Sequence, residues 1–496
     1  MTTIRSGAPA RPRGDGLIRL ADDARILSRA ECDALYQRIV AFARGGGETN
    51  VRISSWWQGE LRWARNRVSV GSDRRDVRVI IGRTIPNGAG GGATSNQLDD
   101  ASLEAAVRAA ERVSKLGSQM GNGSGDYPTL PEYTRPASTV WSDATYGLTT
   151  ERRGEIARTM IAPAEAKGML SAGYLEVRAA SRAVIDAAHP ELRAGGAALW
   201  EDPYIAWTQA QCSTTVRDQT GTGSGWAGLS AFDWAKIDPA ALGARALEKC
   251  LASQHPVSLE PGRYTVILEP QAVADLVEIL VGTLSHREDP EDGVPSPWRL
   301  APDEATGLWR SKLGLKVVDE RITISHDTAD PALGIVAAVT ERPGPVTWID
   351  HGVLTNLGHF LTTAIRGLPG RYSLRGPTGY RMSGGETTIE EMIRTTKRGL
   401  LVTRFSNIRP LDGESLLATG LTRDGLWLIE NGKISKAVKN FRFTESPLFV
   451  LNSLEQLGPA VPIFRPTLDE GGALTPAIVP ALKARDFSFT STIDAI

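Results

Sequence analysis

Cysteine and histidine are scarce in this 496-residue chain, and their spacing excludes several classes of protein. The three cysteines, Cys32, Cys212 and Cys250, stand far apart and form no Cys-x-x-Cys pair. This spacing excludes a disulfide scaffold and a cysteine-rich zinc module, and it favours a reducing compartment. No two of the six histidines lie three to five residues apart, and none belongs to a His-Glu-x-x-His motif. The histidines therefore predict no metal site.

Net charge and long apolar runs are also lacking. Lys and Arg together number 56 and Asp and Glu 57, which leaves a formal net charge of −1. This balance argues against a nucleic-acid coat and against a polybasic membrane anchor. The sequence has no run of about 18 apolar residues, so we expect no membrane-spanning helix. Residues 1–20 carry arginines without a following apolar region, so we expect a loose tail and no secretory signal.

What the chain does contain is typical of a folded, multidomain protein. Apolar residues make up 41% and charged residues 23%, which excludes a disordered chain. At about 150 residues per domain, the length indicates two to four domains. The 51 glycines and 29 prolines supply many turns, which favours a strand-rich architecture.

Residues 21–254 predict an N-terminal α/β domain with antiparallel sheets. Ser28 and Glu31 have the spacing of a capping box and start the first helix, and Asp238 followed by Pro239 starts the last. The other predicted elements are helices over 100–116 and 149–167 and short alternating strands over 50–57, 61–70, 76–81, 173–178, 183–188, 195–200 and 205–217. The order α-β-β-β-α therefore occurs twice.

Residues 255–458 predict a C-terminal, β-rich domain with a few helices. A strand over 262–268 precedes a helix that begins at Pro270, and Asn431-Gly432 is a strong hairpin signal. Overlapping Thr-x-x-Glu capping boxes predict a further helix over 387–397. The fold class is therefore α+β, with a barrel or sandwich in this half. Residues 459–496 follow as an apolar C-terminal extension that we expect to dock on the body or on a partner.

The residues alone give no recognisable catalytic set. Residues 221–226 (GTGSGW) fail the Gly-x-Ser-x-Gly spacing of a nucleophile elbow. The glycine-rich loop 88–92 lacks the Gly-Lys-Ser/Thr ending of a phosphate-binding loop. The chain reads as a two-domain protein whose strand edges suit an extended peptide.

Several C-terminal segments nevertheless resemble one family. Five segments carry the likeness: 221–226 (GTGSGW), 319–323 (DERIT), 390–405 with EEMI and TKRGLLVTRF, 421–434 (LTRDGLWLIENGKI) and 438–446 (VKNFRFTES). Together they resemble the TldD/PmbA family, also called the TldD/TldE or modulator-of-gyrase peptidases. The resemblance covers roughly residues 148–458 and is strongest after Gly384.

The resemblance implies a two-subunit cytoplasmic peptidase that acts on unfolded or modified peptides, including the maturation of peptide antibiotics. In this family the TldD-type subunit carries zinc on a His-Glu-x-x-x-His helix with a distant Cys, and the TldE-type subunit lacks the motif. Our overlay places Glu278, Ile279 and Thr283 at the His, Glu and His positions. Ile279 and Thr283 cannot supply a zinc ligand and a base, and no cysteine follows Cys250.

We therefore expect a TldE-like, non-catalytic subunit without a cofactor of its own, paired with a zinc-bearing TldD-like partner in a heterodimer or larger complex. The candidate substrate contacts, for which a structural role stays open, are Arg404, Arg423, Asp424, Asn440 and Arg442. Two alternatives remain. The first is a stand-alone hydrolase with another centre, for example His286 with Glu288 and Asp289, and the second is a homodimeric peptide-binding protein.

Overall fold

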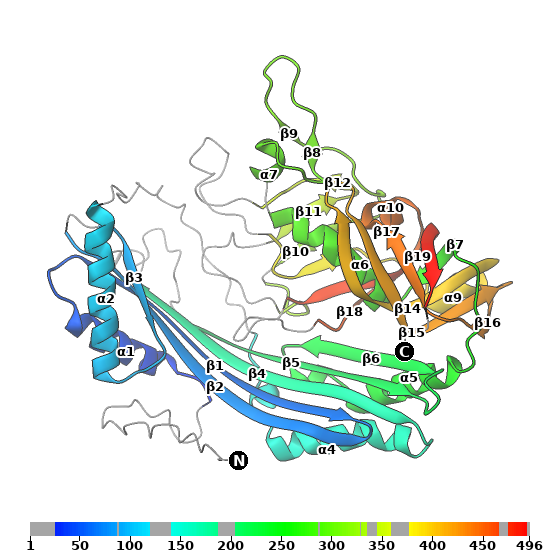
Figure 1. Cartoon of the computed structure of the whole chain (residues 1–496), viewed down its shortest axis with the longest axis horizontal. Helices are drawn as coiled ribbons and strands as arrows, with labels where there is room; N and C mark the ends of the chain where they lie inside the picture. Colours follow the sequence, from blue (N-terminus) through cyan, green and yellow to red (C-terminus); the bar gives the residue numbers. More distant parts are fainter. Residues whose placement is uncertain are drawn as a thin grey trace, which may run out of the picture.

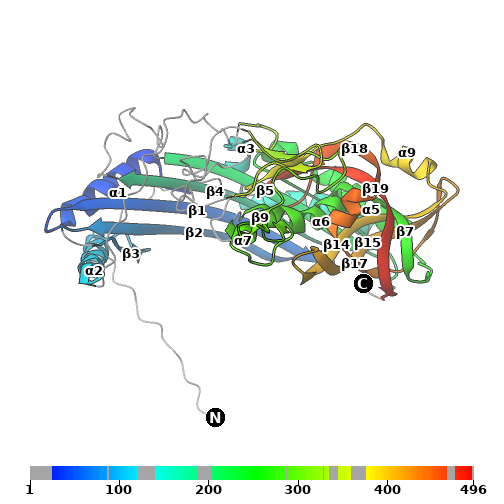
Figure 2. The same ribbon diagram turned by 90° about the horizontal axis from the view of Figure 1, so that it is seen from above.

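Two sheets organise the molecule, and each belongs to one half of the chain. In the computed structural model, a long curved sheet forms the N-terminal half and a barrel with short attached strands forms the C-terminal half (Figure 1). The structure describes residues 25–86, 89–119, 140–186, 204–285, 288–327, 329–334, 345–358, 376–465 and 475–493. Seen from above, the long strands extend well beyond the barrel, so the N-terminal sheet projects as an arm (Figure 2).

The N-terminal sheet consists of two α-β-β-β-α units placed side by side. The first unit comprises α1 (Arg29–Phe42), β1 (Glu48–Ala64), β2 (Arg67–Thr84), β3 (Gly91–Ser95) and α2 (Asp100–Gln119). The second comprises α3 (Asp143–Tyr146), α4 (Thr150–Glu165), β4 (Leu170–Asp186), β5 (Tyr204–Arg217), β6 (Ser224–Ala231), the short 3₁₀ turn η2 (Trp234–Lys236) and α5 (Pro239–Ala252). The strand order is β3-β2-β1-β4-β5-β6, so β1 and β4 join the two units. The predicted capping box at Ser28 and the N-cap at Asp238 are both confirmed.

The predicted short strands of this sheet are wrong in their bounds. Residues 50–57 and 61–70 are not two strands, because β1 runs unbroken to Ala64 and turns into β2 at Arg65 and Asn66. Both turn residues have positive φ, 51° and 63°, as a two-residue hairpin loop requires. The strands predicted over 173–178 and 183–188 are likewise one strand, β4. The strand predicted over 195–200 lies outside the described residues.

The two faces of this sheet differ in chemistry. On one face Trp57 and Trp63 are buried in the cluster that contains Ile156 and Met160 of α4. The opposite face carries a polar row, in which Gln58 Nε2 donates to a Glu176 oxygen at 2.7 Å. Gln211 Nε2 donates to the other Glu176 oxygen at 2.9 Å, and Gln211 pairs in register with Ser230 of β6. A polar face thus leads along the sheet toward the C-terminal half.

The C-terminal half is built around a closed ring of strands. Its elements are β7 (Gly262–Leu268), α6 (Pro270–Gly282), η3 (Thr283–Ser285), α7 (Glu288–Glu291), β8 (Arg299–Leu300), β9 (Arg310–Ser311), β10 (Ile324–His326), β11 (Val346–Asp350), β12 (Val353–Leu354), β13 (Tyr380–Met382), α9 (Ile389–Arg394), β14 (Arg398–Asp412), β15 (Leu417–Glu430), β16 (Lys433–Ala437), β17 (Phe441–Glu445), α10 (Pro447–Asn452), β18 (Leu454–Pro462) and β19 (Ala477–Thr492). The strands β7, β14, β15, β17 and β19 pair in that order, and β19 pairs back with β7. Phe405, Phe443 and Phe487 pack together in the adjoining core, with the first two ring centroids 4.6 Å apart.

Predictions for this half are confirmed in part. The strand β7, the helix α6 that begins at Pro270, and the hairpin of β15 and β16 around Asn431-Gly432 are all present. The helix predicted over 387–397 is shorter, because α9 spans only six residues. The extension predicted over 459–496 is corrected, because β19 closes the barrel rather than docking on it. No helix among the described residues is long and apolar enough to cross a membrane.

Candidate functional site

A buried carboxylate connects the two halves of the chain. Asp424 of β15 has a side chain only 2% exposed, and its Oδ2 accepts a hydrogen bond from Arg404 Nε at 2.8 Å and a second from Arg404 Nη2. Its other oxygen accepts from Ser224 Oγ of β6 at 2.6 Å. Asp424 therefore binds a barrel strand and the N-terminal sheet at once. We call Ser224, Trp226, Asp275, Arg404 and Asp424 the junction cluster.

The local backbone explains why Asp424 points inward. The register of β14 and β15 shifts between Val402 and Arg404, which is a bulge. Opposite the shift, Asp424 has φ of 57° and Gly425 has φ of 126°. Asp tolerates the left-handed region better than most residues, and glycine adopts it without steric cost. The sequence Asp-Gly thus forms a bulge that turns a strand carboxylate toward the junction.

An aromatic stack covers the Arg404 guanidinium. Its central carbon lies 4.7 Å from the ring centroid of Trp226 in β6, close enough for a cation–π interaction. The Trp226 ring in turn meets Phe464 edge-on, with centroids 5.7 Å apart. Phe464 belongs to the segment after β18, so three distant parts of the chain meet on one charged group.

Asp275 extends the charged network into α6. Its side chain is half-buried and accepts hydrogen bonds from the Phe405 backbone N–H and from Gln271 Nε2, both at 2.9 Å. Burial raises the pKa of Asp275 to about 6, and these hydrogen bonds and the charges of Arg404 and Arg465 oppose that rise. An acidic group with a pKa in this range titrates near neutrality.

The three positions aligned with the zinc motif do not offer zinc ligands. Glu278 is paired with Arg465, whose Nη2 donates to Glu278 Oε1 at 2.8 Å. Ile279 packs against the barrel core. Thr283 Oγ1 donates to the Leu280 carbonyl at 2.7 Å and lies 3.1 Å from the Trp298 indole N–H.

This donor set does not fit zinc, because Zn²⁺ needs several converging imidazole, thiolate or carboxylate ligands. Across the described part of the chain, no three His, Cys, Asp or Glu side chains are grouped to hold a metal ion. A guanidinium instead occupies the place beside Glu278. We therefore derive no chemical step through a metal in this chain.

Arg465 also joins the two halves. Its backbone N–H donates to Ser230 Oγ at 2.9 Å, and Ser230 Oγ donates back to its carbonyl at 3.0 Å. Nearby, Lys249 Nζ of α5 lies 2.7 Å from Glu269, the residue before α6. Burial lowers the pKa of Lys249, and Glu269 opposes that effect. The polar face of the N-terminal sheet therefore ends in a set of charge-assisted contacts with the barrel.

A small cavity of about 240 Å³ adjoins this junction. Residues of both halves line it, among them Thr222, Ser224, Ser253, Gly425, Lys439 and Asn440. Asn440 is held in place because its Oδ1 accepts a hydrogen bond from Thr422 Oγ1 at 3.0 Å. The cavity combines hydroxyl and amide groups with the apolar residues Leu426, Val438 and Ile493, which suits a peptide-like ligand.

The five residues predicted as substrate contacts do not all meet. Arg404, Asp424 and Asn440 lie at the junction or its cavity. Arg423 is half-buried and stands opposite Arg404 in register, and Arg442 is exposed on β17. Neither arginine is among the residues that line the cavity. Their substrate role stays a prediction.

Sequence reasoning missed Asp275 and Arg465. Asp275 lies in a helix whose apolar positions were recognised, and an acidic residue there was the available signal. Arg465 lies in the segment predicted as an extension, where nothing in the sequence connects it with Glu278.

The alternative centre predicted around His286 lies outside the described residues at His286 itself. His326 is buried, with its pKa lowered to about 4 by burial, and His351 is exposed beside Asp350.

Comparisons with known proteins agree with this architecture. Residues 261–491 match the family model of the PmbA/TldA metallopeptidase C-terminal domain. Three crystal structures resemble this chain over their own full length, each with 16% sequence identity. They are a candidate modulator of a DNA gyrase from Thermotoga maritima (TM-score 0.73, 92% of this chain), TldE from Thermococcus kodakarensis (0.71, 93%) and a candidate modulator of DNA gyrase from Bacteroides thetaiotaomicron (0.67, 94%).

The two kinds of comparison have different weight. No curated protein sequence matches the chain at a significant level. At 16% identity the structural likeness shows a shared fold across both halves. The family-model match covers the barrel and the junction residues of β14, β15 and α6. On this match, residues 261–491 form a C-terminal domain of the TldD/PmbA family.

Proposed function

We propose that this chain is a TldE-like, non-catalytic subunit of a zinc metallopeptidase complex. The observation that carries the proposal is the chemistry of the three side chains to which our overlay assigns the family's zinc motif. Glu278 is engaged by Arg465, Ile279 is apolar, and the Thr283 hydroxyl is bonded within its own turn. Peptide hydrolysis at a metal requires an open coordination site with an activated water, which these side chains cannot build.

The proposed role is to hold and orient a peptide for a partner that carries zinc. The junction cavity is lined by groups from both halves, and Arg404, Asp424 and Asn440 lie beside it. With Arg423 and Arg442 they form our candidate set for substrate contact. The partner is a TldD-like subunit in a cytoplasmic heterodimer or larger complex, and peptide maturation is the process we assign to it.

The test is zinc content, native mass and peptide cleavage, measured first on the isolated chain and then after co-expression with a His-Glu-x-x-x-His protein from the same source. We expect the isolated chain to hold far less than one equivalent of zinc and to cleave nothing. The co-expressed complex should contain zinc and cleave unfolded peptides. A matched control is the same complex in which the first His of the partner's motif is replaced by alanine.

Three outcomes would overturn this proposal. Near-stoichiometric zinc on the isolated chain would mean that another ligand set exists. Peptide cleavage by the isolated chain, unchanged by the partner, would support a stand-alone hydrolase. A stable dimer of this chain that binds peptide and refuses the partner would support a homodimeric peptide-binding protein.

A further inference from the structure

A hairpin at the end of the C-terminal half that faces away from the N-terminal sheet carries exposed apolar side chains. It consists of β8 and β9, which form a separate two-stranded sheet, and Figure 1 shows it projecting beyond the rest of this half. Leu308 is 68% exposed and Trp309 37%, and exposed apolar side chains that adjoin one another mark interaction sites. We call residues 298–312 the β8–β9 hairpin.

Trp309 is held in place by its neighbours. Gly293, with φ of 83°, lies against the indole so closely that an added Cβ would be 2.5 Å from Trp309 Nε1. The central carbon of Arg299 lies 4.8 Å from the ring centroid, and Arg299 Nη1 donates to the Gly293 carbonyl at 2.6 Å. The exposed part of the indole is therefore ordered before any partner arrives, which lowers the entropic cost of binding.

The tip of the hairpin is ordered as well, and it is acidic. One Asp303 oxygen accepts hydrogen bonds from the backbone N–H groups of Ala305 and Thr306, both at 3.1 Å. The Asp303 N–H donates to the Leu308 carbonyl at 2.8 Å and closes the turn. Glu304 is exposed and makes no ion pair within the described residues. The tip therefore presents a carboxylate that can take a partner.

The base of the hairpin offers the opposite charge. A hollow of about 360 Å³ lies there, and its lining includes Leu300, Pro302, Trp309 and Lys312. Lys312 Nζ donates to the Pro297 carbonyl at 2.7 Å and has no carboxylate partner in the described part of the chain. The carboxylate that also lines the hollow, Glu414, is engaged by Arg299. An ammonium group thus remains to receive a further carboxylate.

The tip and the base lie on opposite sides of Trp309. The Lys312 N–H donates to the Trp298 carbonyl at 2.7 Å, so these two residues stand level. Glu304 is six positions beyond Trp298, which at about 3.3 Å per residue gives roughly 20 Å. Trp309 is three positions from Lys312, about halfway. Two antiparallel hairpins related by a two-fold axis at Trp309 therefore bring each Glu304 to the Lys312 of the other copy.

This arrangement joins complementary groups, as an interface between two identical surfaces requires. The apolar side chains of Leu308 and Trp309 meet near the axis, where the hollow of each copy has room for Leu308 of the other. A parallel arrangement would instead place Glu304 against Glu304 and Lys312 against Lys312, which is unfavourable.

We propose that the β8–β9 hairpin binds the same hairpin of a second copy of this chain, antiparallel about a two-fold axis. Trp and Arg often dominate the energy of an interface, and here Trp309 and Arg299 stack at its centre. Two hairpins bury less area than a permanent dimer does, so we expect weak association in the micromolar range. The surface lies away from the junction, so each copy could keep a zinc-bearing partner, and the inference does not depend on the proposed function.

The experiment measures self-association of the full chain by sedimentation velocity across a wide concentration range. Glu304→Lys and Lys312→Glu should each raise the Kd of the dimer about tenfold or more, because each places like charges at both ends of the interface. Leu308→Ser should raise it about tenfold. The control Glu386→Lys reverses an exposed carboxylate outside the hairpin and should leave the Kd unchanged.

Mixing two variants gives the sharpest test. Equimolar Glu304→Lys and Lys312→Glu chains should associate about as tightly as the wild type, since the reversed tip of one meets the reversed base of the other. A mixture that associates no more tightly than either variant alone would refute the contact between tip and base.

Three further observations would refute the proposal. A wild type that stays monomeric at every concentration would exclude the dimer. Variants that dimerise like the wild type would place the contact elsewhere on the chain. If Glu304→Lys lost binding to a co-expressed zinc-bearing partner while self-association stayed unchanged, the hairpin would belong to that partner's interface. The melting temperature of each variant verifies that it is folded.

Discussion

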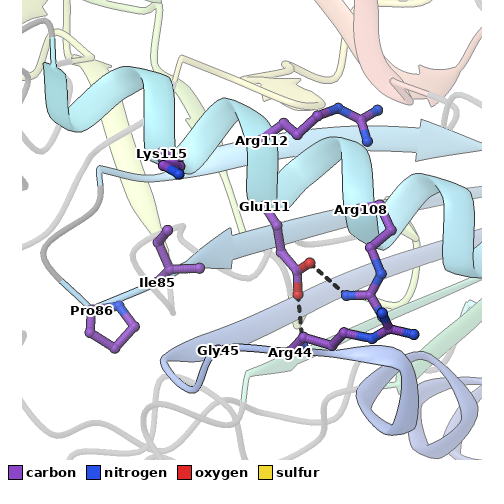
Figure 3. A pocket seen from close by; sticks show the side chains of 8 residues that line it. All are labelled: Arg44, Gly45, Ile85, Pro86, Arg108, Glu111, Arg112 and Lys115. Atoms are coloured by element: carbon purple, nitrogen blue, oxygen red, sulfur yellow. Dashed lines mark hydrogen bonds and ion pairs between the residues drawn. The ribbon is translucent and has the colours of Figure 1, made fainter.

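The junction cluster and a surface hollow beside α2 are both rich in arginine and carboxylate, but they differ in solvent exposure. We call this hollow the α2 pocket, and its lining residues are Arg44, Gly45, Ile85, Pro86, Arg108, Glu111, Arg112 and Lys115 (Figure 3). At the junction the Asp424 side chain is 2% exposed and Arg404 25%. At the α2 pocket Arg44 is 73% exposed, and Arg112 is exposed as well. Water therefore screens Arg44 and Arg112 more strongly than Asp424, whereas Arg108 and Glu111 of the α2 pocket, 22% and 15% exposed, are partly shielded.

The difference separates what holds the fold from what is free to bind. Removing one partner of a buried pair leaves an uncompensated charge and is strongly destabilising, whereas exposed pairs contribute little. The junction charges therefore fix the barrel against the N-terminal sheet. At the α2 pocket the exposed Arg112 can be reached by a ligand without breaking a buried pair. Four measurements test this contrast.

The largest effect should come from Asp424→Ala. It leaves Arg404 without its carboxylate and Ser224 without its acceptor, so we expect the free energy of unfolding to fall by about 3 to 5 kcal/mol. Urea denaturation measures the loss. The matched control is Asp486→Ala, because Asp486 has almost the same φ, 59° against 57°, but is exposed. Equal losses in both variants would mean that backbone strain, not the buried charge, decides stability.

The second effect concerns Asp275 and pH. Its pKa is about 6 in the folded chain and about 3.9 in an unfolded one, so the folded state holds more protons between those values. The free energy of unfolding should therefore gain about 2 kcal/mol from this group as the pH falls from about 7 to 4. Asp275→Asn should lack that gain. Superimposable pH curves for wild type and variant would contradict the assignment.

The third effect is a coupling of about 1 kcal/mol between Glu278 and Arg465. Because Glu278 is 43% exposed, this pair is worth less than the buried one. A double-mutant cycle of Glu278→Ala and Arg465→Ala, followed by urea denaturation, measures the coupling. Arg465→Ala alone should keep its backbone bonds to Ser230. A coupling of zero would mean that the pair occupies the aligned zinc position without contributing to stability.

The smallest effect is expected at the α2 pocket. The variant Arg112→Glu/Lys115→Glu should change the free energy of unfolding by no more than about 0.5 kcal/mol, because both side chains are exposed. Thermal melting of wild type and variant side by side measures this. A drop as large as that of Asp424→Ala would erase the contrast and assign the α2 cations to the fold.

Elements with a local signal could be predicted from the sequence. The capping box at Ser28, the Asp-Pro start of α5 and the Asn-Gly turn after β15 each depend on residues within a few positions of one another. The hairpin between β1 and β2 was missed because its turn residues are Arg65 and Asn66, which carry no glycine. Gly59 and Gly71 lie inside the paired strands β1 and β2, next to the ends predicted for the strands over 50–57 and 61–70.

The rest depends on contacts between distant parts of the chain. The candidate site was found in part, because Asp424 and Asn440 lie in segments with a recognisable pattern. Arg465 was not found, since its pairing with Glu278 joins positions 187 residues apart. The environment of Asp275 was also beyond a one-sequence reading, because its hydrogen bond from the Phe405 backbone joins positions 130 residues apart.

The closing strand β19 has a consequence for synthesis. Its partner β7 begins at Gly262, more than 200 residues earlier, and the ring of strands is complete only when the two pair. On the ribosome, the N-terminal sheet can form from strands that are near neighbours, since β1 to β6 precede the barrel entirely. The barrel cannot close before residues 477–492 leave the exit tunnel, and one edge of its sheet stays unpaired until then. An unpaired edge exposed for that long is a site for misassociation, so the last strand sets how long the nascent chain is vulnerable.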